Sequence, residues 1–233
     1  MGVLEGYLMN FMIIKKAFKE SIPVMMGYLV LGFAFGVLLV SKGYPIYYSF
    51  IMSVFIYAGS MQFVAISLLT SKSTFLNAFI MTLMVNARHL VYGLSMLNRF
   101  NGMKALKPYM IFSLTDETFS LLVKDDKQNK YVSFFISLFD QCYWIIGSLA
   151  GAVLGTTISF NSKGLEFSMT ALFVVIVIEQ IKNNKNHWAT IIGFTFTIIS
   201  LLIFGKENFV IISLIGIVLI LLIKRKDLEN KYE

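Results

Sequence analysis

Charge, cysteine and histidine are all scarce in this sequence. Of its 233 residues, 14% are charged and 57% are hydrophobic, and the mean hydropathy is +0.75. A soluble domain carries roughly 25% charged residues, so the composition excludes an ordinary water-soluble domain. The single cysteine, Cys142, excludes an intramolecular disulfide.

Motifs of known enzyme classes are absent as well. The sequence has no GxSxG, no HExxH, no Walker loop and no cysteine–histidine cluster with metal-ligand spacing. With two histidines and one cysteine, a zinc site would have to rely on carboxylates. We therefore expect no catalytic activity, no metal and no other cofactor.

The net charge of +7 has a topological explanation. The lysines lie at the ends of apolar blocks and do not cluster into the single face that nucleic acid would require, so we expect no nucleic-acid partner. A cleavable signal is not expected either. Lys15, Lys16 and Lys19 follow the first apolar patch, and no small-residue cleavage site precedes them.

Long uncharged blocks are what the sequence does contain. Stretches of about 17–25 apolar residues can cross a hydrocarbon core of about 30 Å. We therefore expect an all-α fold, a polytopic helical bundle integral to the lipid bilayer. The apolar blocks lie at about 22–41, 45–71, 74–98, 131–158, 165–181, 188–205 and 208–223, with a half-polar piece at 109–123.

The domain organisation follows from these blocks. Residues 1–21 are expected to form a cytoplasmic lead-in, amphipathic or disordered over residues 1–14. Residues 22–223 form a single transmembrane domain, and residues 224–233 form a basic cytoplasmic tail.

The distribution of lysine and arginine favours one topology, because these residues collect on the cytoplasmic side. In the favoured arrangement, 45–71 is a re-entrant hairpin, 109–123 does not span, about six helices cross, and both termini are cytoplasmic. The opposite face then holds Lys42, Lys72, Lys163 and Lys206. If both segments span, giving about seven or eight crossings, Lys72 moves in while Arg99, Lys104 and Lys107 move out, which fits the bias less well.

Small residues in the middle of the 45–71 block favour a break in the helix there. Tyr57-Ala58-Gly59-Ser60 places small residues there, including a conformationally free glycine. Irregular backbone persists at membrane depth only where protein or a water-filled cavity satisfies its polar groups. The alternative is a continuous helix whose small residues allow close packing.

Two glycine stripes indicate close helix packing. Gly32 and Gly36 form one GxxxG pair, and Gly147, Gly151 and Gly155 repeat the same spacing. This spacing places small residues along one helix face and lets two backbones approach each other. An inverted duplication of the transporter kind is one explanation, although no residue-level repeat supports it.

Arg88 and Asp140 lie at similar depths inside apolar blocks. Arg88 lies 11 residues from Arg99, about 16 Å along a helix, and Asp140 lies 10 residues from Lys130, about 15 Å. An unpaired charge at that depth costs at least a few kcal/mol. Two alternatives follow: a pair or shared polar cavity on a transport path, or a structural ion pair that locks two helices.

Polar residues near Arg88 and near the break are further candidates. Asn86 and His89 share the helical segment of Arg88, and His89 is either a satisfied hydrogen-bonding group or a proton relay. Gln62 follows the break, where the N-terminus of a half-helix would present free amides to an anion.

The 109–123 segment contains a helix-start signal. Thr115 is a good N-cap residue, and Asp116 and Glu117 suit the first turn of a helix. These acidic residues are therefore either capping chemistry or part of a polar site.

Five stretches in order resemble the AzlC family of bacterial and archaeal branched-chain amino acid exporters. The resemblance covers about residues 22–181 and is weak over 187–223. The stretches are YAGSMQFVAISLL (57–69), NARHLVYGLSM (86–96), SLTDETFSLL (113–122), QCYWIIGSLAGAVLG (141–155) and GLEFSMTALFVVIVIEQ (164–180).

The resemblance implies a multi-pass secondary transporter in a prokaryotic cytoplasmic membrane. It would export valine, leucine, isoleucine or analogues by alternating access, as the large subunit beside a small membrane partner of the AzlD type. Coupling to protons is compatible with this mechanism, and the sequence leaves the coupling ion open. The alternatives are a non-transporting scaffold or sensor subunit, and an exporter or channel for a different small solute.

A branched-chain amino acid is a zwitterion with an apolar tail. Its carboxylate would bind Arg88 or half-helix amides near residues 60–62, and its ammonium group would bind Asp116, Asp140 or free helix carbonyls. The candidates for contact with the tail are Phe63, Tyr92 and Met96. The candidate residues for substrate binding and translocation are Arg88, Asn86, His89, Gly59, Ser60, Gln62, Asp116, Glu117, Asp140 and Tyr92.

Overall fold

The structure is a computed structural model. It describes residues 2–123, 129–157 and 187–223, and also residues 174, 177, 178, 181 and 182. Some side chains inside these ranges, that of Arg88 among them, lie outside the description. As predicted, the described residues are helical and form no strand. The chain divides into two units, Met1–Thr170 and Ala171–Glu233, which are described separately.

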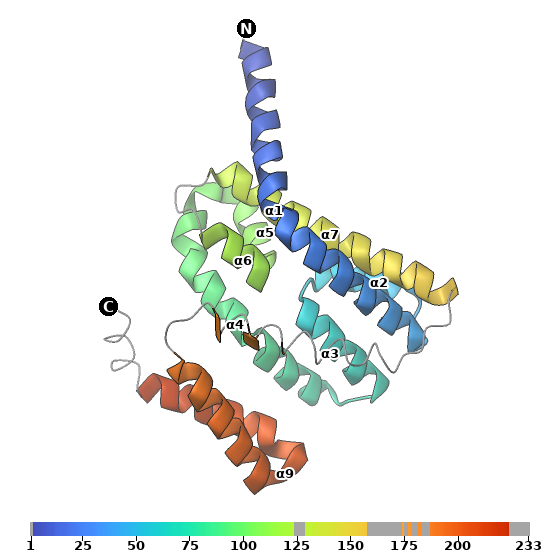
Figure 1. Ribbon diagram of the computed structural model, residues 1–233, viewed down its shortest axis with the longest axis vertical. Helices are drawn as coiled ribbons and strands as arrows, with labels where there is room; N and C mark the ends of the chain where they lie inside the picture. The colour runs from blue at the N-terminus through green and yellow to red at the C-terminus, as the bar shows by residue number, and fades with distance from the viewer. Residues whose placement is uncertain are drawn as a thin grey trace. The chain divides into compact units, whose positions relative to one another are not determined.

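The first unit consists of long helices and short, interrupted ones (Figure 1). In chain order they are α1 (Gly2–Ser41), α2 (Ile46–Phe55), α3 (Gly59–Thr70), α4 (Phe75–Phe100), the 3-10 helix η1 (Asn101–Leu106), α5 (Lys107–Phe112), α6 (Asp116–Val123) and α7 (Lys130–Thr157).

Helix α1 runs without interruption from Gly2 through the first apolar block, with Pro23 inside it. Helix α1 therefore includes residues of the expected lead-in as well as the first apolar block. Among the described helices, two stretches are long and apolar enough to cross a membrane, Phe11–Ser41 and Lys130–Thr157.

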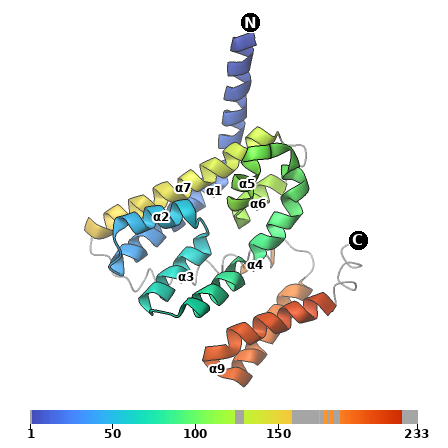
Figure 2. The ribbon, with the colours of Figure 1, turned by 180° about the vertical axis from the view of Figure 1, so that it is seen from behind.

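Helices α1 and α7 lie side by side and run parallel (Figures 1 and 2). Residue numbers increase in the same direction along both helices at their contacts. Phe18 packs edge-on against Phe139, with ring centroids 5.9 Å apart, and further along both helices Tyr28 packs against Trp144 at 5.5 Å. Two consecutive spans of a chain run antiparallel, so parallel α1 and α7 require an odd number of full crossings between them.

The two glycine stripes of the sequence face each other across this pair. A methyl group added at Gly32 would lie 3.0 Å from the Ser148 nitrogen, and one at Gly36 would lie 2.5 Å from the Ala152 nitrogen. From the other side, a methyl group at Gly147 would lie 2.8 Å from the Leu29 carbonyl oxygen. The backbones are thus in contact, which explains the GxxxG spacing on both helices.

The predicted break in the 45–71 block is present. Helix α2 ends at Phe55, Tyr57 adopts a left-handed φ of 41°, and α3 begins at Gly59. A backbone conformation of this kind is uncommon for a residue with a side chain. The continuous-helix alternative is therefore wrong.

Helices α2 and α3 form a broken hairpin that folds back on itself. Val54 accepts a hydrogen bond from Gln141 while Ser49 donates to Ser148, so α2 runs antiparallel to α7. Helix α3 runs parallel to α1, because Phe63 packs on Phe35 and the later α3 residues reach Lys42. The chain therefore returns to the end of α1 from which it left.

A second broken hairpin comes from the opposite end. Helix α4 carries the chain to the level of Ala17 and Ile136, which share a buried cluster with Phe100. Helix α5 then leads inward and α6 leads back, because the α6 residue Leu122 accepts a hydrogen bond from Arg99 at the end of α4. The break between α5 and α6 lies at residues 113–115.

The first unit thus contains two similar arrangements in opposite directions. Each consists of a long helix followed by a broken hairpin: α1 with α2 and α3, then α4 with α5 and α6. Discontinuous helices arranged with opposite polarity are typical of transporters built from inverted repeats. The sequence alone showed no such repeat.

The second unit contains α9 (Trp188–Ile223), which changes direction at Gly205. Gly205 has φ 68° and ψ −178°, a conformation that favours glycine. A methyl group at Gly216 would collide with the ring of Phe196, so the two halves of α9 pack against each other. The predicted block at 165–181 lies mostly outside the described residues.

Candidate functional site

The tips of the two broken hairpins meet beside α7. Tyr57, at the first break, and Phe112, just before the second, have ring centroids 6.2 Å apart. Gly59 lies against the indole of Trp144, where an added methyl group would be 3.0 Å from Cη2. We call this meeting place the junction, and its buried side chains are Tyr28, Tyr57, Thr115, Thr118, Asp140 and Trp144.

Asp140 is the acidic group of the junction, and its side chain is fully buried. Thr118 donates a hydrogen bond to Asp140 Oδ2 over 2.8 Å. Asp140 Oδ1 is also buried and has no hydrogen-bond partner among the described residues. An unpaired buried carboxylate oxygen is costly, so this oxygen requires a proton or a hydrogen-bond donor from outside the described residues.

The N-terminus of α6 holds Thr118 in place. The Thr118 amide donates to Thr115 Oγ1 over 3.2 Å, and Thr115 Oγ1 also lies 3.0 Å from Thr118 Oγ1. This is the predicted N-cap, and Asp116 and Glu117 occupy the first turn. The capping interpretation of 115–117 is therefore correct for Thr115, whose hydroxyl also extends the polar network toward Asp140.

Tyr28 of α1 ties this network to Glu117. Its hydroxyl group donates to Glu117 Oε2 over 2.8 Å and lies 2.5 Å from Thr115 Oγ1. The two acidic candidates Glu117 and Asp140 are thereby brought into one chain of hydrogen bonds. Asp116 is half-buried in the same turn of α6.

A second polar network reaches α7 at Ser148, about two turns from Asp140. Gln62 is fully buried, and its amide nitrogen donates to Ser53 over 3.4 Å. The Ser53 hydroxyl in turn lies 2.8 Å from that of Ser148, while Gln62 Oε1 has no hydrogen-bond partner among the described residues. Ser60, two residues before Gln62, is also buried in the first turn of α3.

The start of α3 lies among buried side chains, with Gly59 against Trp144. Gly59, Ser60 and Met61 are its first residues, and no side chain caps the helix. The first amides of a helix lack intrahelical partners and carry a partial positive charge. Together with Asp140, they provide the opposite charges that a zwitterion needs.

The α4 candidates border the junction from another side. Tyr92 stacks on Phe119, with ring centroids 4.4 Å apart, and His89 packs edge-on against Tyr92 at 6.0 Å. Asn86 is half-buried. The backbone of Arg88 lies in α4, and its side chain is outside the described part, so its pairing with Asp140 stays a prediction.

The three side chains proposed for an apolar tail do not form one surface. Met96 is buried in a cluster with Ala17 and Phe100, and Tyr92, one turn earlier in α4, packs against the same cluster. Tyr92 is occupied by its stacking on Phe119. Phe63 packs on Phe35 instead, with ring centroids 5.8 Å apart.

Four junction residues were not among the site residues predicted from the sequence: Tyr28, Tyr57, Thr118 and Trp144. Tyrosine, threonine and tryptophan are ordinary residues in apolar helices, and their partners lie far away in sequence. One signal was available, because Trp144 follows Asp140 by four residues and so shares its helix face.

In the described part of the chain, no three histidine, cysteine, aspartate or glutamate side chains are grouped so as to hold a metal ion.

Comparison with known proteins identifies a family and several membrane proteins of similar sequence. The sequence profile of the family described as "AzlC protein" matches residues 23–158. A Bacillus subtilis protein named "Branched-chain amino acid transport protein AzlC" is 41% identical over 220 residues, 93% of this chain and 87% of that protein. A membrane protein of Helicobacter pylori is 45% identical over 219 residues, 92% of this chain and 96% of that protein. No solved structure matches.

Proposed function

Because this chain belongs to the AzlC family of membrane proteins, we propose that it is a secondary transporter exporting valine, leucine, isoleucine or analogues. The name of the Bacillus subtilis relative supports the substrate class. The observation that carries the proposal is the junction: a buried carboxylate, one oxygen of which has no hydrogen-bond partner among the described residues, near the start of α3, which has no side-chain cap. Ionisable groups inside membrane helices mark solute or proton pathways.

In this proposal the amino acid binds with its two charges separated. Its ammonium group lies at Asp140 Oδ1, in reach of the Glu117 and Tyr28 network. Its carboxylate lies at the start of α3, near Gly59, or at Arg88. The remaining candidates, Asn86, His89, Tyr92, Gln62 and Asp116, line the path around it.

The proposed mechanism is alternating access. The two broken hairpins enter from opposite ends of the first unit and end at the junction, so movement of one hairpin at a time would open the site to one side. Transporters with discontinuous helices bind their solutes at such midplane breaks. Asp140 could carry a proton when no amino acid is bound, which would couple export to the proton gradient.

We propose the re-entrant topology, with both termini cytoplasmic and the cytoplasmic membrane as the location. The return of α3 to the end of α1 supports it, because Lys42 and Lys72 then share the outer face. A small AzlD-type subunit is the proposed partner, as the family resemblance implies.

Cysteine labelling tests this topology. In a Cys142→Ser background, Lys72→Cys is expected to react with a membrane-impermeant maleimide added to intact cells. Lys104→Cys, on the cytoplasmic side, is expected to react only after permeabilisation. Reaction of Lys104→Cys in intact cells, with Lys72→Cys protected, would show that 45–71 spans the membrane.

Export from loaded cells tests the function itself. Cells lacking their own branched-chain exporters are loaded with a leucine-containing dipeptide, which peptidases hydrolyse inside. Expression of the chain with its small partner is expected to speed leucine efflux several-fold, because hydrolysis drives internal leucine above its external level.

The alternatives predict other outcomes of the same assay. A scaffold or sensor subunit leaves leucine efflux unchanged when it is expressed or deleted. A transporter for another solute leaves leucine unchanged while a different metabolite accumulates outside the cells. Either result refutes export of branched-chain amino acids.

A further inference from the structure

Gln141 of α7 contacts both broken hairpins with the two ends of its amide group. The Tyr109 hydroxyl, on α5 of the second hairpin, donates to Gln141 Oε1 over 2.8 Å. Gln141 Nε2 donates in turn to the carbonyl of Val54, in the last turn of α2 of the first hairpin, over 3.1 Å. Gln141 is 7% exposed, so water has little access to this amide.

The two partners fix the orientation of the amide group. A backbone carbonyl oxygen can only accept a hydrogen bond, so the nitrogen of Gln141 has to face Val54. The oxygen of Gln141 then faces Tyr109, whose hydroxyl group donates. With the amide turned round, two carbonyl oxygens would face each other with no proton between them. Both bonds therefore form only when both hairpins are in place.

The break in the first hairpin supplies the Val54 carbonyl. Carbonyl groups in the last turn of a helix lack intrahelical partners, and α2 ends at Phe55, one residue after Val54. With Tyr57 in a left-handed conformation, its amide donates to the Met52 carbonyl, 3.0 Å away. The break that shapes the hairpin tip thus also leaves an acceptor for Gln141.

The second hairpin is bonded to α7 on either side of its own break. Thr118 donates to Asp140, and Tyr109 donates to Gln141, the next residue of α7. Nearer its base, the hairpin packs in the buried apolar cluster that contains Ile136. Because hydrogen bonds are directional, the two bonds at residues 140 and 141 define the closed position of the tip.

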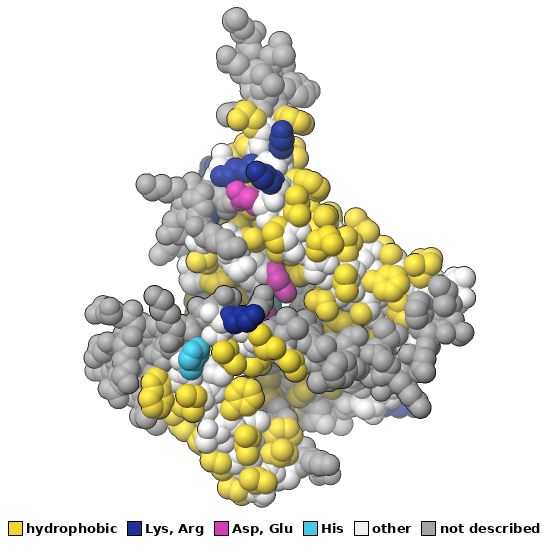
Figure 3. All heavy atoms as spheres, in the orientation of Figure 1, with side chains coloured by type: hydrophobic (Ala, Val, Ile, Leu, Met, Phe, Trp, Pro, Cys, Tyr) yellow, Lys and Arg dark blue, Asp and Glu magenta, His cyan; other side chains and the backbone are white. Residues whose placement is uncertain are grey.

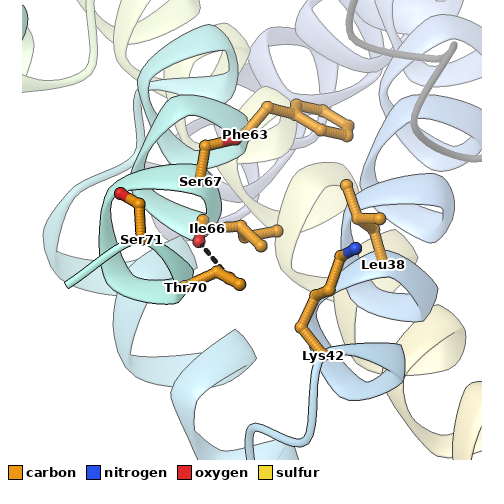
Figure 4. A pocket seen from close by; sticks show the side chains of 7 residues that line it. All are labelled: Leu38, Lys42, Phe63, Ile66, Ser67, Thr70 and Ser71. Atoms are coloured by element: carbon orange, nitrogen blue, oxygen red, sulfur yellow. Dashed lines mark hydrogen bonds between the residues drawn. The ribbon is translucent and has the colours of Figure 1, made fainter. Parts of the chain in front are cut away.

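The first hairpin is held to α7 at a further level. Ser49 and Ser53 of α2 bond to Ser148, over 3.0 and 2.8 Å, so α2 has polar contacts to α7 that do not involve the amide. Helix α3 instead borders a cavity of about 390 Å³ at the end of α1, and Figure 4 shows Ile66 of α3 facing Leu38 across it. Loss of the amide therefore affects the second hairpin more than α2.

We propose that the bridge from Tyr109 through Gln141 to Val54 is a latch that keeps the second hairpin closed over Asp140. When the latch opens, α5 and α6 move away from α7 and the junction opens to the cytoplasm. This direction rests on the proposed function and its topology, in which the second hairpin enters from the cytoplasmic side. Gln141 is thus a positioning residue, which acts through the hairpin and not by contact with the solute.

The reactivity of a thiol at the hairpin tip tests the latch. Ser113→Cys, in the full-length Cys142→Ser chain, replaces a fully buried residue at the break between α5 and α6. Its reaction with a membrane-impermeant methanethiosulfonate reagent is timed in inside-out and right-side-out membrane vesicles. Gln141→Met keeps the length of the side chain and removes the amide. It is expected to speed the reaction roughly two- to tenfold in inside-out vesicles only, the shift for loss of one ordinary hydrogen bond.

Tyr109→Phe breaks the latch from the opposite side. It removes the hydroxyl group and keeps the ring, which packs on Phe134 with centroids 5.6 Å apart. We expect the same rise in inside-out reactivity as for Gln141→Met. The double variant should react no faster than Gln141→Met alone, because both changes remove the same bond to the second hairpin.

Tyr143→Phe is the matched control. It also removes a tyrosine hydroxyl group that joins two helices, since the Tyr143 hydroxyl lies 3.1 Å from Ser21 Oγ of α1. Tyr143 lies two residues beyond Gln141 on α7, and its bond involves neither hairpin. The reactivity of Ser113→Cys is expected to be unchanged by this control in both kinds of vesicle.

Folding of each variant is checked by size exclusion and a thermal melt, and Tyr109→Phe decides the outcome if Gln141→Met does not fold. Unchanged inside-out reactivity in the folded variants would overturn the proposal. A rise in right-side-out vesicles, or an equal rise with Tyr143→Phe, would also overturn it, because general loosening of the helices has that effect. If inside-out reactivity rises as expected while the chain exports no leucine, the latch stands and the proposed function fails.

Discussion

Replacing Gly36 by leucine is expected to eliminate folded protein, whereas the same change at Gly27 is expected to be tolerated. At Gly36, an added methyl group would already meet the Ser148 carbonyl and lie 2.5 Å from the Ala152 nitrogen. At Gly27, in the same helix, no atom lies within 4 Å of an added methyl group. The contrast isolates helix contact from any general effect of leucine on α1.

The physical reason is the backbone contact between α1 and α7. Overpacking usually costs about 1–3 kcal/mol when side chains can shift. Here the obstacle is backbone, so leucine would push apart the two helices that position the junction. Alanine at Gly36 is expected to lower the melting temperature in detergent, while alanine at Gly27 is expected to keep it or raise it slightly, since alanine favours helix.

Fluorescence-detected size exclusion and a thermal melt check this prediction. We expect a monodisperse peak for Gly27→Leu and loss of that peak for Gly36→Leu. Gly151→Leu, on the opposite helix, should behave like Gly36→Leu. Equal behaviour of Gly27→Leu and Gly36→Leu would mean that the two glycine stripes are not in contact.

Asp140→Asn is expected to reduce leucine export by roughly tenfold to a hundredfold, because a hydrogen bond to a charged group contributes about 1.5–3 kcal/mol. Asparagine keeps the shape of the side chain and can still accept the hydrogen bond from Thr118. It removes the charge that attracts the ammonium group and the ability to carry a proton. The folded protein should therefore remain while transport is lost.

Leucine efflux from dipeptide-loaded cells measures the effect, with protein level and melting temperature determined in parallel. Glu20→Gln is the matched control, since Glu20 forms a partly exposed ion pair with Lys16 on α1, 3.7 Å apart, outside the junction. Exposed pairs of this kind contribute little, and export should be unchanged. Normal export by a well-folded Asp140→Asn protein would assign Asp140 a structural role.

The local features of this fold were accessible from sequence. The break near Tyr57 and the cap at Thr115 depend on neighbouring residues, so short-range rules were sufficient to predict them. The close-packing glycines of α1 and α7 were predictable as a spacing. That the two stripes face each other was not, since it depends on helices separated by about a hundred residues in the chain.

Only part of the candidate site was predictable, because its contacts also join residues far apart in the sequence. Asp140 is conspicuous because a carboxylate in an apolar helix is costly, and it does lie in the junction. Its hydrogen-bond donor, Thr118, was not identified, because a threonine hydroxyl can also satisfy itself on its own helix. The apposition of the two hairpin tips is a long-range contact that no periodicity encodes.

The surface of the first unit is consistent with a lipid environment. Large apolar side chains are exposed along α1 and α7, among them Met26, Val30, Ile146 and Val153 (Figure 3). Exposed lysines lie on α1 nearer the N-terminus, at Lys15, Lys16 and Lys19. Apolar flanks bounded by basic residues are expected of helices that end at a cytoplasmic interface.

Counterflow of radiolabelled leucine tests whether the chain transports this amino acid and whether transport needs Asp140. The purified chain with its small partner is reconstituted into liposomes preloaded with unlabelled leucine, and external label is followed over time. We expect transient accumulation of label with the wild-type chain and none with Asp140→Asn at equal reconstitution. Wild-type liposomes that take up no more label than protein-free liposomes, or Asp140→Asn liposomes that match the wild type, would contradict it.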